Sequence, residues 1–552
     1  MANYRKLFPV LALSSAVLLS IPYLVPHTGW LILFGFIPLL CMENIAFQTG
    51  KKHFFFWHFL TFVLWNTFTT FWVCNATVGG GIFAIVANSL QMSLVFGLFR
   101  LSRKALKGPA PYVFLAFLWI AWEKYYLTVA EISWPWLVLG NAFAGNVSLV
   151  QWYEFTGVLG GSLWAWCVNL AVFGLLMMVA DGSFFSRSLK ARCLLAGFVA
   201  LFVLGPILVS GHLYYHYEEE ENPLEVVAAQ PNFDPYHKFE YLSQAQQTSI
   251  LLSQLTESID TCEAKKPLLI LVPETFTSDV WLNSPWDSQT LRSMRDFLRG
   301  YPKANIITGA STHEFWSIND AGSPRLDRGL YPYLGKAAPS ITARRLGSGM
   351  WYESHNSAIK VDTTLNLEFY HKSKLVVGTE LTPYPKIFCP IDDMLGGVMA
   401  RDLPQGYVKN LRIAGGTRIA PVICYESVYG EWCRGYVRDG AQALAIITND
   451  AWWGNTPGYR QHLWYACLRA IETRRDVVRC ANTGISAIID QRGNIVEKTS
   501  WWQPAVLKGR VNLSDRKTHF VLYGDIVGKM SVVFAALMLL SLVVRLITNK
   551  RN

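Results

Sequence analysis

The chain has 552 residues, of which 52% are hydrophobic and only 16% are charged. Soluble proteins usually carry ~25% charged residues, so the composition argues against an ordinary soluble protein, and the 14% aromatic content excludes a disordered one. The net charge is +10, yet residues 218–520 hold 33 Lys and Arg against 33 Asp and Glu, so the whole excess lies elsewhere. This distribution does not predict a nucleic-acid-binding surface.

Eight apolar runs predict membrane crossings. Most of them reach the ~20 residues that a transmembrane helix needs. A cleavable signal peptide is the alternative for the first run, but its removal would reverse the orientation of every later one. The runs are 7–25, 28–48, 54–74, 80–99, 111–130, 150–180, 193–213 and 521–544.

Basic residues give these crossings an orientation. If the N-terminus is cytoplasmic, each even-numbered crossing returns to the cytoplasm and is followed by a basic cluster, at 51–52, 100–107, 187–192 and 545–551. The outer turns near 21–27, 74–80 and 131–149 contain no Lys or Arg. By the positive-inside rule, residues 1–217 form a membrane domain of seven helices, residues 218–520 lie outside the cytoplasm, and residues 521–552 form a last helix with a short basic tail.

The exported segment has the pattern of an α/β domain. Short apolar runs alternate with helical stretches at 240–261, 286–300 and 458–475, which predicts a sheet covered by helices. Regions 321–350 and 382–408 are rich in turn-forming residues and are expected to be long loops. The predicted strands are 224–230, 267–272, 305–309, 357–361, 419–424, 443–448 and 486–490.

Three predicted strand ends carry reactive side chains. Glu274 follows Val272 and Pro273, Lys372 lies in the run Tyr370–Leu375, and Cys424 ends an apolar strand. A nucleophile placed at a strand-to-helix turn is exposed there and faces backbone N–H groups. Each feature alone has an ordinary alternative, namely a helix cap, a solvated lysine or a buried inert cysteine.

Taken together, the three residues resemble the catalytic set of the nitrilase, or carbon–nitrogen hydrolase, superfamily. The order is Glu274, then Lys372, then Cys424, each at a strand edge. Residues 224–518 resemble that superfamily's domain, and the whole chain resembles the bacterial apolipoprotein N-acyltransferase family. Further matching segments are 449–454, Gln461 with His462, 469–472 and 479–484. The resemblance implies an α-β-β-α sandwich facing the periplasm and tethered to about eight helices of the bacterial inner membrane.

The resemblance also implies roles for individual residues. Glu274 matches the catalytic glutamate, Lys372 the lysine and Cys424 the nucleophile. Supporting or oxyanion roles fall on Glu380, Tyr425 and Glu426. Lys372 is preferred to Lys374 because Glu380 lies eight residues after it. The segment 376–380 departs from the proline and aromatic residue often found in the family before that glycine and glutamate.

The implied reaction is a two-step acyl transfer. Cys424 takes an acyl chain from a phospholipid such as phosphatidylethanolamine and forms a thioester. The chain then passes to the α-amino group of the S-diacylglyceryl cysteine that begins an apolipoprotein. Expected partners are therefore phospholipid, a diacylated apolipoprotein and membrane lipid, with no nucleic acid, no cofactor, no metal and a monomeric chain.

Four aromatic residues are expected to line the entrance to the site. Tryptophan and tyrosine favour the membrane–water interface. We expect the loops that carry them to act as lids or substrate-binding elements. They are Trp351, Tyr352, Trp452 and Trp453.

Two other functions compete with acyl transfer. A membrane-tethered amidase or nitrilase would use the same three residues with water as the acceptor. A transporter or scaffold is disfavoured because the acidic residues of the apolar segments, such as Glu43 and Glu123, stand near ends or turns rather than in mid-membrane.

The orientation leads to a labelling prediction. A cysteine introduced as Gly300→Cys should react in intact spheroplasts with a membrane-impermeant maleimide. One introduced as Lys104→Cys should react only after the membrane is opened. The reverse pattern would contradict the proposed orientation.

Overall fold

The structure is a computed structural model, and it describes residues 4–50, 54–235, 238–259, 266–317, 340–347, 350–395 and 398–551. The chain divides into two compact units. The helical unit comprises residues 1–217, 455–472 and 518–552, and the sheet unit comprises 218–454 and 473–517.

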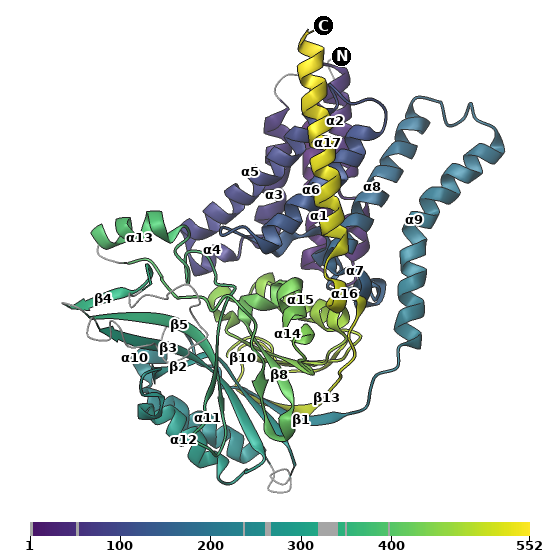
Figure 1. Cartoon of the computed structure of the whole chain (residues 1–552). Helices are drawn as coiled ribbons and strands as arrows, with labels where there is room; N and C mark the ends of the chain where they lie inside the picture. Colours follow the sequence, from purple (N-terminus) through teal and green to yellow (C-terminus); the bar gives the residue numbers. More distant parts are fainter. Residues whose placement is uncertain are drawn as a thin grey trace. The chain divides into compact units, whose positions relative to one another are not determined.

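The helical unit consists of long apolar helices (Figure 1). Six segments in the described ranges are long and apolar enough to cross a membrane: 6–24, 29–48, 78–102, 158–180, 189–216 and 526–548. The other two predicted crossings form α3, of 16 residues, and α6, of 19 residues. The helices are α1 (Tyr4–Leu24), α2 (Ile37–Gln48), α3 (Phe55–Thr70), α4 (Val73–Ala76), α5 (Val78–Ser102), α6 (Ala110–Thr128), α7 (Tyr153–Thr156), α8 (Val158–Ala180), α9 (Leu189–His216), α15 (Pro457–Thr473), α16 (His519–Tyr523) and α17 (Ile526–Arg551).

The last helix, α17, packs on α6. Phe534 stacks on Phe117 with ring centroids 5.0 Å apart. Near the start of α17, Asp525 forms an ion pair with Lys124 at 3.3 Å. The C-terminal crossing is therefore part of the same bundle as the N-terminal helices.

Helix α15 belongs to the helical unit although it lies far from the other helices in sequence. Trp136 Nε1 donates to Gln461 Oε1 at 2.6 Å, and the Tyr465 hydroxyl donates to the Trp136 carbonyl at 2.8 Å. Further along α15, the backbone N–H of Val158 donates to Glu472 at 2.9 Å. All of these side chains are buried, so the bonds form in a medium of low dielectric, where a missing partner is costly.

The sheet unit is built on two sheets. One has the strand order β13-β1-β2-β3-β5-β4, with β6 paired to β5, and the other has the order β12-β11-β10-β9-β8-β7. The strands are β1 (Pro223–Gln230), β2 (Leu268–Trp281), β3 (Ala304–Ser317), β4 (Arg344–Gly347), β5 (Met350–Val361), β6 (Glu368–His371), β7 (Leu411–Arg412), β8 (Arg418–Ile423), β9 (Ala443–Thr448), β10 (Val477–Ala481), β11 (Ala487–Ile489), β12 (Ile495–Lys498) and β13 (Ala505–Asn512). The helices are α10 (Lys238–Tyr241), α11 (Gln244–Ser258), α12 (Gln289–Leu298), α13 (Pro385–Met394) and α14 (Gly430–Arg438).

The two sheets pack face to face. Strands β1, β2 and β3 run parallel, as do β8, β9 and β10. Between the sheets, the thiol of Cys480 on β10 lies 3.1 Å from the carbonyl oxygen of Ala229 and 3.3 Å from that of Leu271. With helices on the outer faces, this arrangement confirms the predicted fold class of a helical membrane bundle joined to an α-β-β-α sandwich.

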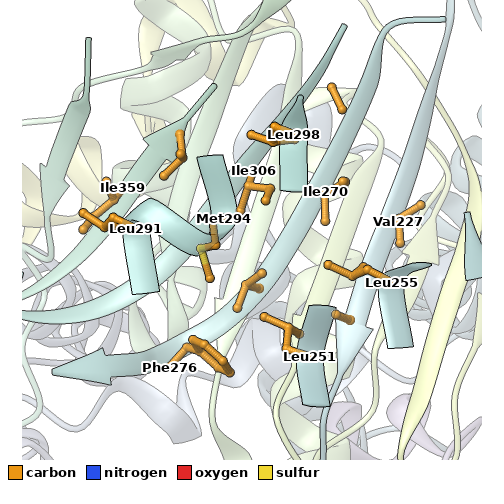
Figure 2. Packing of buried hydrophobic residues seen from close by; sticks show 14 of the residues in the cluster. Val227, Leu251, Leu255, Ile270, Phe276, Leu291, Met294, Leu298, Ile306 and Ile359 are labelled. Carbon is orange, nitrogen blue, oxygen red and sulfur yellow. The ribbon is translucent and has the colours of Figure 1, made fainter. Parts of the chain in front are cut away.

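A hydrophobic core fixes α11 and α12 to the outer face of the first sheet (Figure 2). Leu251 and Leu255 of α11 and Leu291 of α12 are fully buried against the strands. Their spacing places them on one face of each helix, while successive strand residues alternate between faces. The other face of this sheet packs against the second sheet.

The structure corrects two local expectations. Region 382–408 is not a continuous loop, because residues 385–394 form α13, which begins at Pro385 and turns the buried Cys389 and Asp392 inward. Trp351 and Tyr352 are not in a loop either, because both lie in β5, paired with Trp316 and Phe315 of β3. Turn-forming residues near these segments favoured the prediction of loops. Whether a segment forms a strand also depends on its pairing with residues that are distant in the sequence.

The core gives a stability prediction. Leu251→Ala should lower the free energy of unfolding of the sheet unit by about 2–5 kcal/mol, because it leaves a cavity in a close-packed core. The adjacent Ile250, which is 37% exposed, provides the matched control. Ile250→Ala should change the free energy of unfolding by less than about 1 kcal/mol. Pulse proteolysis in a urea series measures both, and equal losses would contradict the packing.

Candidate active site

Glu274 projects from a break in β2. The pairing of β2 with β3 shifts register between Val272 and Thr277, so the strand is irregular where Glu274 leaves it. Thr275 has a φ of +47°, a strained value for a β-branched residue. Gly309 of β3 accommodates this bend, because a Cβ there would lie 2.5 Å from the Glu274 Cα. The backbone is thus shaped to present the carboxylate.

Lys372 follows β6 and points its ammonium at two carboxylates. Its Nζ lies 2.9 Å from Glu274 Oε1 and 2.8 Å from Glu380 Oε1. The side chain is 1% exposed. Burial alone would lower the pKa of Lys372, but Glu274 and Glu380 raise it well above its usual value. Lys372 is therefore a fixed positive charge.

Asn356 completes this cluster, and the sequence reasoning missed it. Its side-chain N–H₂ donates to Glu274 Oε1 at 2.8 Å and to Glu380 Oε1 at 2.9 Å, while its backbone carbonyl accepts from the backbone N–H of Lys372 at 2.7 Å. Asn356 thus binds both carboxylates and holds the backbone of Lys372. No motif marked it, because its role depends on the pairing of β5 with β6, which places it one residue from the Ser357–His371 pair.

Cys424 lies directly after β8, at the first residue of the 3₁₀ helix Cys424–Val428. Its φ of +48° is strained for a residue with a Cβ, as expected for a nucleophile at a sharp turn. Burial raises the pKa of the Cys424 thiol well above its usual value, and Glu274 raises it further, whereas Lys372 lowers it. The thiol is therefore protonated at rest and within electrostatic range of both residues.

Glu426 supports the site through the backbone. Its Oε1 accepts from the Tyr370 hydroxyl at 2.5 Å and from the backbone N–H of Ser373 at 2.8 Å, and its Oε2 accepts from the N–H of Ile423 at 3.0 Å. The carboxylate thereby ties the segment after Lys372 to the turn that carries Cys424. Glu380 contacts the Lys372 ammonium directly, whereas Glu426 binds backbone N–H groups next to Lys372 and next to Cys424.

Two further groups surround the carboxylates. The backbone N–H of Asn449 donates to Glu274 Oε2 at 3.1 Å. Asp402, which the sequence reasoning also missed, donates its backbone N–H to the Glu380 carbonyl at 2.8 Å. Burial, and then the neighbouring Glu380, raise the pKa of Asp402 to about 7. The site thus holds an additional carboxyl that titrates near neutrality.

The segment after β9 is held by a buried ion pair. Asp450 Oδ2 accepts from Arg479 Nη2 at 2.6 Å, and both side chains are fully buried. Gly484 permits close packing here, because a Cβ would lie 2.5 Å from Asp450 Oδ2. The ion pair links the segment after β9 to β10, next to the Asn449 N–H that contacts Glu274.

The remaining predicted residues differ in their surroundings. Tyr425 is buried and makes an edge-on contact with Tyr429, with ring centroids 5.2 Å apart. Trp452 is 40% exposed, in the 3₁₀ helix Asp450–Trp453. Trp351 and Tyr352 are half-buried on β5. The structure thus brings Glu274, Lys372, Glu380 and Cys424 together, while a lid role for the aromatic residues stays a prediction.

Comparisons with known proteins find two matching families and several similar proteins. The carbon–nitrogen hydrolase family matches residues 337–518, and the apolipoprotein N-acyltransferase N-terminal domain family matches residues 15–171. The apolipoprotein N-acyltransferase of Chlorobaculum tepidum is 26% identical over 92% of this chain and 91% of that protein, and that of Geobacter metallireducens is 25% identical over 94% and 92%. Among solved structures, Saccharomyces cerevisiae Nit3, of the nitrilase superfamily, is 14% identical with a TM-score of 0.35, over 53% of this chain and 93% of that one.

Most of the match to the carbon–nitrogen hydrolase family falls in the sheet unit, and the match to the N-terminal domain family falls in the helical unit. Over more than nine-tenths of its length, the chain is similar to these two apolipoprotein N-acyltransferases.

The charges around Cys424 predict how its alkylation by iodoacetamide depends on pH. Because Glu274 raises and Lys372 lowers the pKa of the thiol, Glu274→Gln should shift the pH midpoint of alkylation downward and Lys372→Met should shift it upward. The exposed Glu497 provides the control Glu497→Gln, which should not move it. Peptide mass spectrometry across a pH series measures the rate, and shifts of the opposite sign would contradict the geometry.

Proposed function

We propose that this protein transfers an acyl chain from a membrane phospholipid, such as phosphatidylethanolamine, to the N-terminal S-diacylglyceryl cysteine of apolipoproteins. The observation that carries the proposal is the buried cluster in which the Lys372 ammonium contacts Glu274 and Glu380 beside a protonated Cys424. The relatives named as apolipoprotein N-acyltransferases support this choice of substrates.

In the first step, Cys424 Sγ attacks the ester carbonyl carbon of the phospholipid. Because the thiol is protonated at rest, a base must take its proton during the attack, and Glu274 has that role. The Lys372 ammonium stabilises the oxyanion of the tetrahedral intermediate. The ester C–O bond then breaks, the lysophospholipid alkoxide recovers the proton from Glu274, and a thioester stays on Cys424.

In the second step, the α-amine of the lipoprotein attacks the thioester. Glu274 accepts the amine proton as the new C–N bond forms, and the C–S bond then breaks. The proton returns to the Cys424 thiolate. Thioesters react readily with amines, so one residue set serves both half-reactions.

Glu380 and Asn356 keep the lysine charged and aligned. Glu380 helps to raise the pKa of Lys372, and Asn356 holds both carboxylates on one side of the ammonium. Lys372 can then stabilise the oxyanion as a permanent positive charge, without transferring its proton. Preorganised charge of this kind is the largest catalytic contribution in many acyl-transfer enzymes.

The same proposal assigns the sheet unit to the periplasmic side of the inner membrane. Basic residues follow each predicted inward crossing, and the segment 218–520 stands between two predicted crossings. Both substrates are anchored in lipid, so attachment of the domain to a bundle keeps the nucleophile at the leaflet that holds them.

An amidase would use the same residues with water as the acceptor. The two functions separate in one assay. The purified protein in detergent is given either a diacylated lipopeptide with phospholipid or simple amides. Acyl-lipopeptide without ammonia release supports the transferase, and ammonia release supports the amidase.

Acylation with phospholipid alone is the sharpest test of the nucleophile. Wild-type protein should gain one acyl mass on Cys424, and Cys424→Ala should gain none. Lys372→Met should slow acylation by roughly 10²–10³-fold, the usual cost of one oxyanion donor. Intact-protein and peptide mass spectrometry measure both, and an acyl group on Cys424→Ala at the wild-type rate would refute the assignment.

A further inference from the structure

A second cluster of metal-ligating side chains lies in the sheet unit. Glu314 on β3 and Glu353 on β5 are cross-strand partners, and His355 lies two residues after Glu353 on the same face of β5. All three are buried, at 1%, 2% and 1% exposure. The cluster differs from the candidate active site, because Asn356, the next residue of β5, points to the opposite face of the sheet.

The spacing of the ligand atoms fits a single ion. One oxygen from each glutamate and one imidazole nitrogen all lie within 4.8 Å of one another. Three ligand atoms at about 2.0–2.2 Å from one ion stand roughly 3.3–3.8 Å apart. A movement of each side chain by under ~1 Å would therefore bring all three ligand atoms within binding distance of one ion. The regular pairing of β3 and β5 holds the backbones of the three residues in place.

The histidine is prepared for a cation. Its Nδ1 lies 3.0 Å from the carbonyl oxygen of Leu403. A carbonyl accepts only from a protonated nitrogen, so Nδ1 carries the proton and Nε2 is the basic nitrogen, as in most metal-bound histidines.

The glutamates are also arranged for a cation. The backbone N–H of Ser340 donates to Glu353 Oε1 at 2.8 Å, which orients that carboxylate. The two glutamates are directly paired across β3 and β5, so they offer a divalent cation carboxylate oxygens from two adjacent strands.

We propose that Glu314, Glu353 and His355 form a binding site for a divalent transition-metal cation. Two carboxylate oxygens and one imidazole nitrogen are the mixed donors that ions such as Mn²⁺ and Zn²⁺ accept. The site is structural rather than catalytic, because it lies on the opposite face of β5 from Asn356.

The ion would stiffen the strand that positions the candidate active site. Ser354, between two of the ligands, accepts from the backbone N–H of Leu403 at 2.8 Å, and the preceding Asp402 bonds to Glu380 at 2.8 Å. Asn356 follows His355 and binds Glu274 and Glu380. A cation here therefore fixes β5 and segment 402–403 against each other.

Manganese is the probe of choice. The cysteines in the described ranges are free thiols, and they would bind a thiophilic ion such as Zn²⁺ and obscure the result. The full-length protein in detergent is stripped with a chelator, dialysed and titrated with Mn²⁺. Electron paramagnetic resonance measures the unbound ion.

We expect one tightly bound Mn²⁺ per chain, together with a melting temperature that rises with Mn²⁺ concentration. Glu353→Gln, which keeps an acceptor for the Ser340 N–H, and His355→Gln should each weaken binding at least tenfold and abolish the thermal shift. The control Glu225→Gln, which removes a carboxylate paired with Arg510 on the edge of the same sheet, should bind as wild type.

Three results would overturn the site. They are no stoichiometric uptake by wild-type protein, undiminished binding by both ligand variants, and equal weakening by Glu225→Gln. The readouts are metal binding and melting temperature, so they do not depend on whether the acyl-transfer proposal holds.

Discussion

The buried contact between the Lys372 ammonium and two carboxylates is the interaction on which the candidate site depends. Placing three charges in a protein interior is costly unless each is paired. Here Glu274 and Glu380 stand 2.9 Å and 2.8 Å from Nζ, and Asn356 bonds to both carboxylates. Because both carboxylates contact the ammonium, the lysine stays charged, and the Cys424 thiol lies within electrostatic range of Glu274 and Lys372.

The fold brings residues from distant parts of the chain to this contact. The strands β2 and β8 belong to different sheets. Glu274 lies at a break in the pairing of β2, next to the strained Thr275, and the strained Cys424 directly follows β8. Packing the sheets face to face brings these two positions into one site. Glu426 and the Asp450–Arg479 pair then lock the connecting segments, so little reorganisation is needed during the reaction.

Much of this was predictable from sequence, and the reasons are local. Predicted apolar strands run up to Glu274 and Cys424, and the resemblance to the nitrilase superfamily added Lys372 to them. Asn356, Asp402 and the cluster at Glu314 were not predictable, because each acquires its role through cross-strand pairing or a loop that returns from elsewhere. Helix α15 illustrates the same limit: its pattern indicated a helix, but its packing within the helical unit depends on Trp136 and Val158, more than 300 residues away.

The central claim is that Cys424 carries the acyl chain from lipid to amine, and the discharge of a preformed acyl-enzyme tests it most directly. Acyl-enzyme made from phospholipid is freed of donor and mixed with a diacylated lipopeptide whose N-terminus is either free or acetylated, and the products are resolved by mass in a rapid-quench series. The account predicts that only the free amine discharges Cys424, with the whole acyl group recovered as an amide. Release as free fatty acid, or equal discharge by the acetylated peptide, would contradict it.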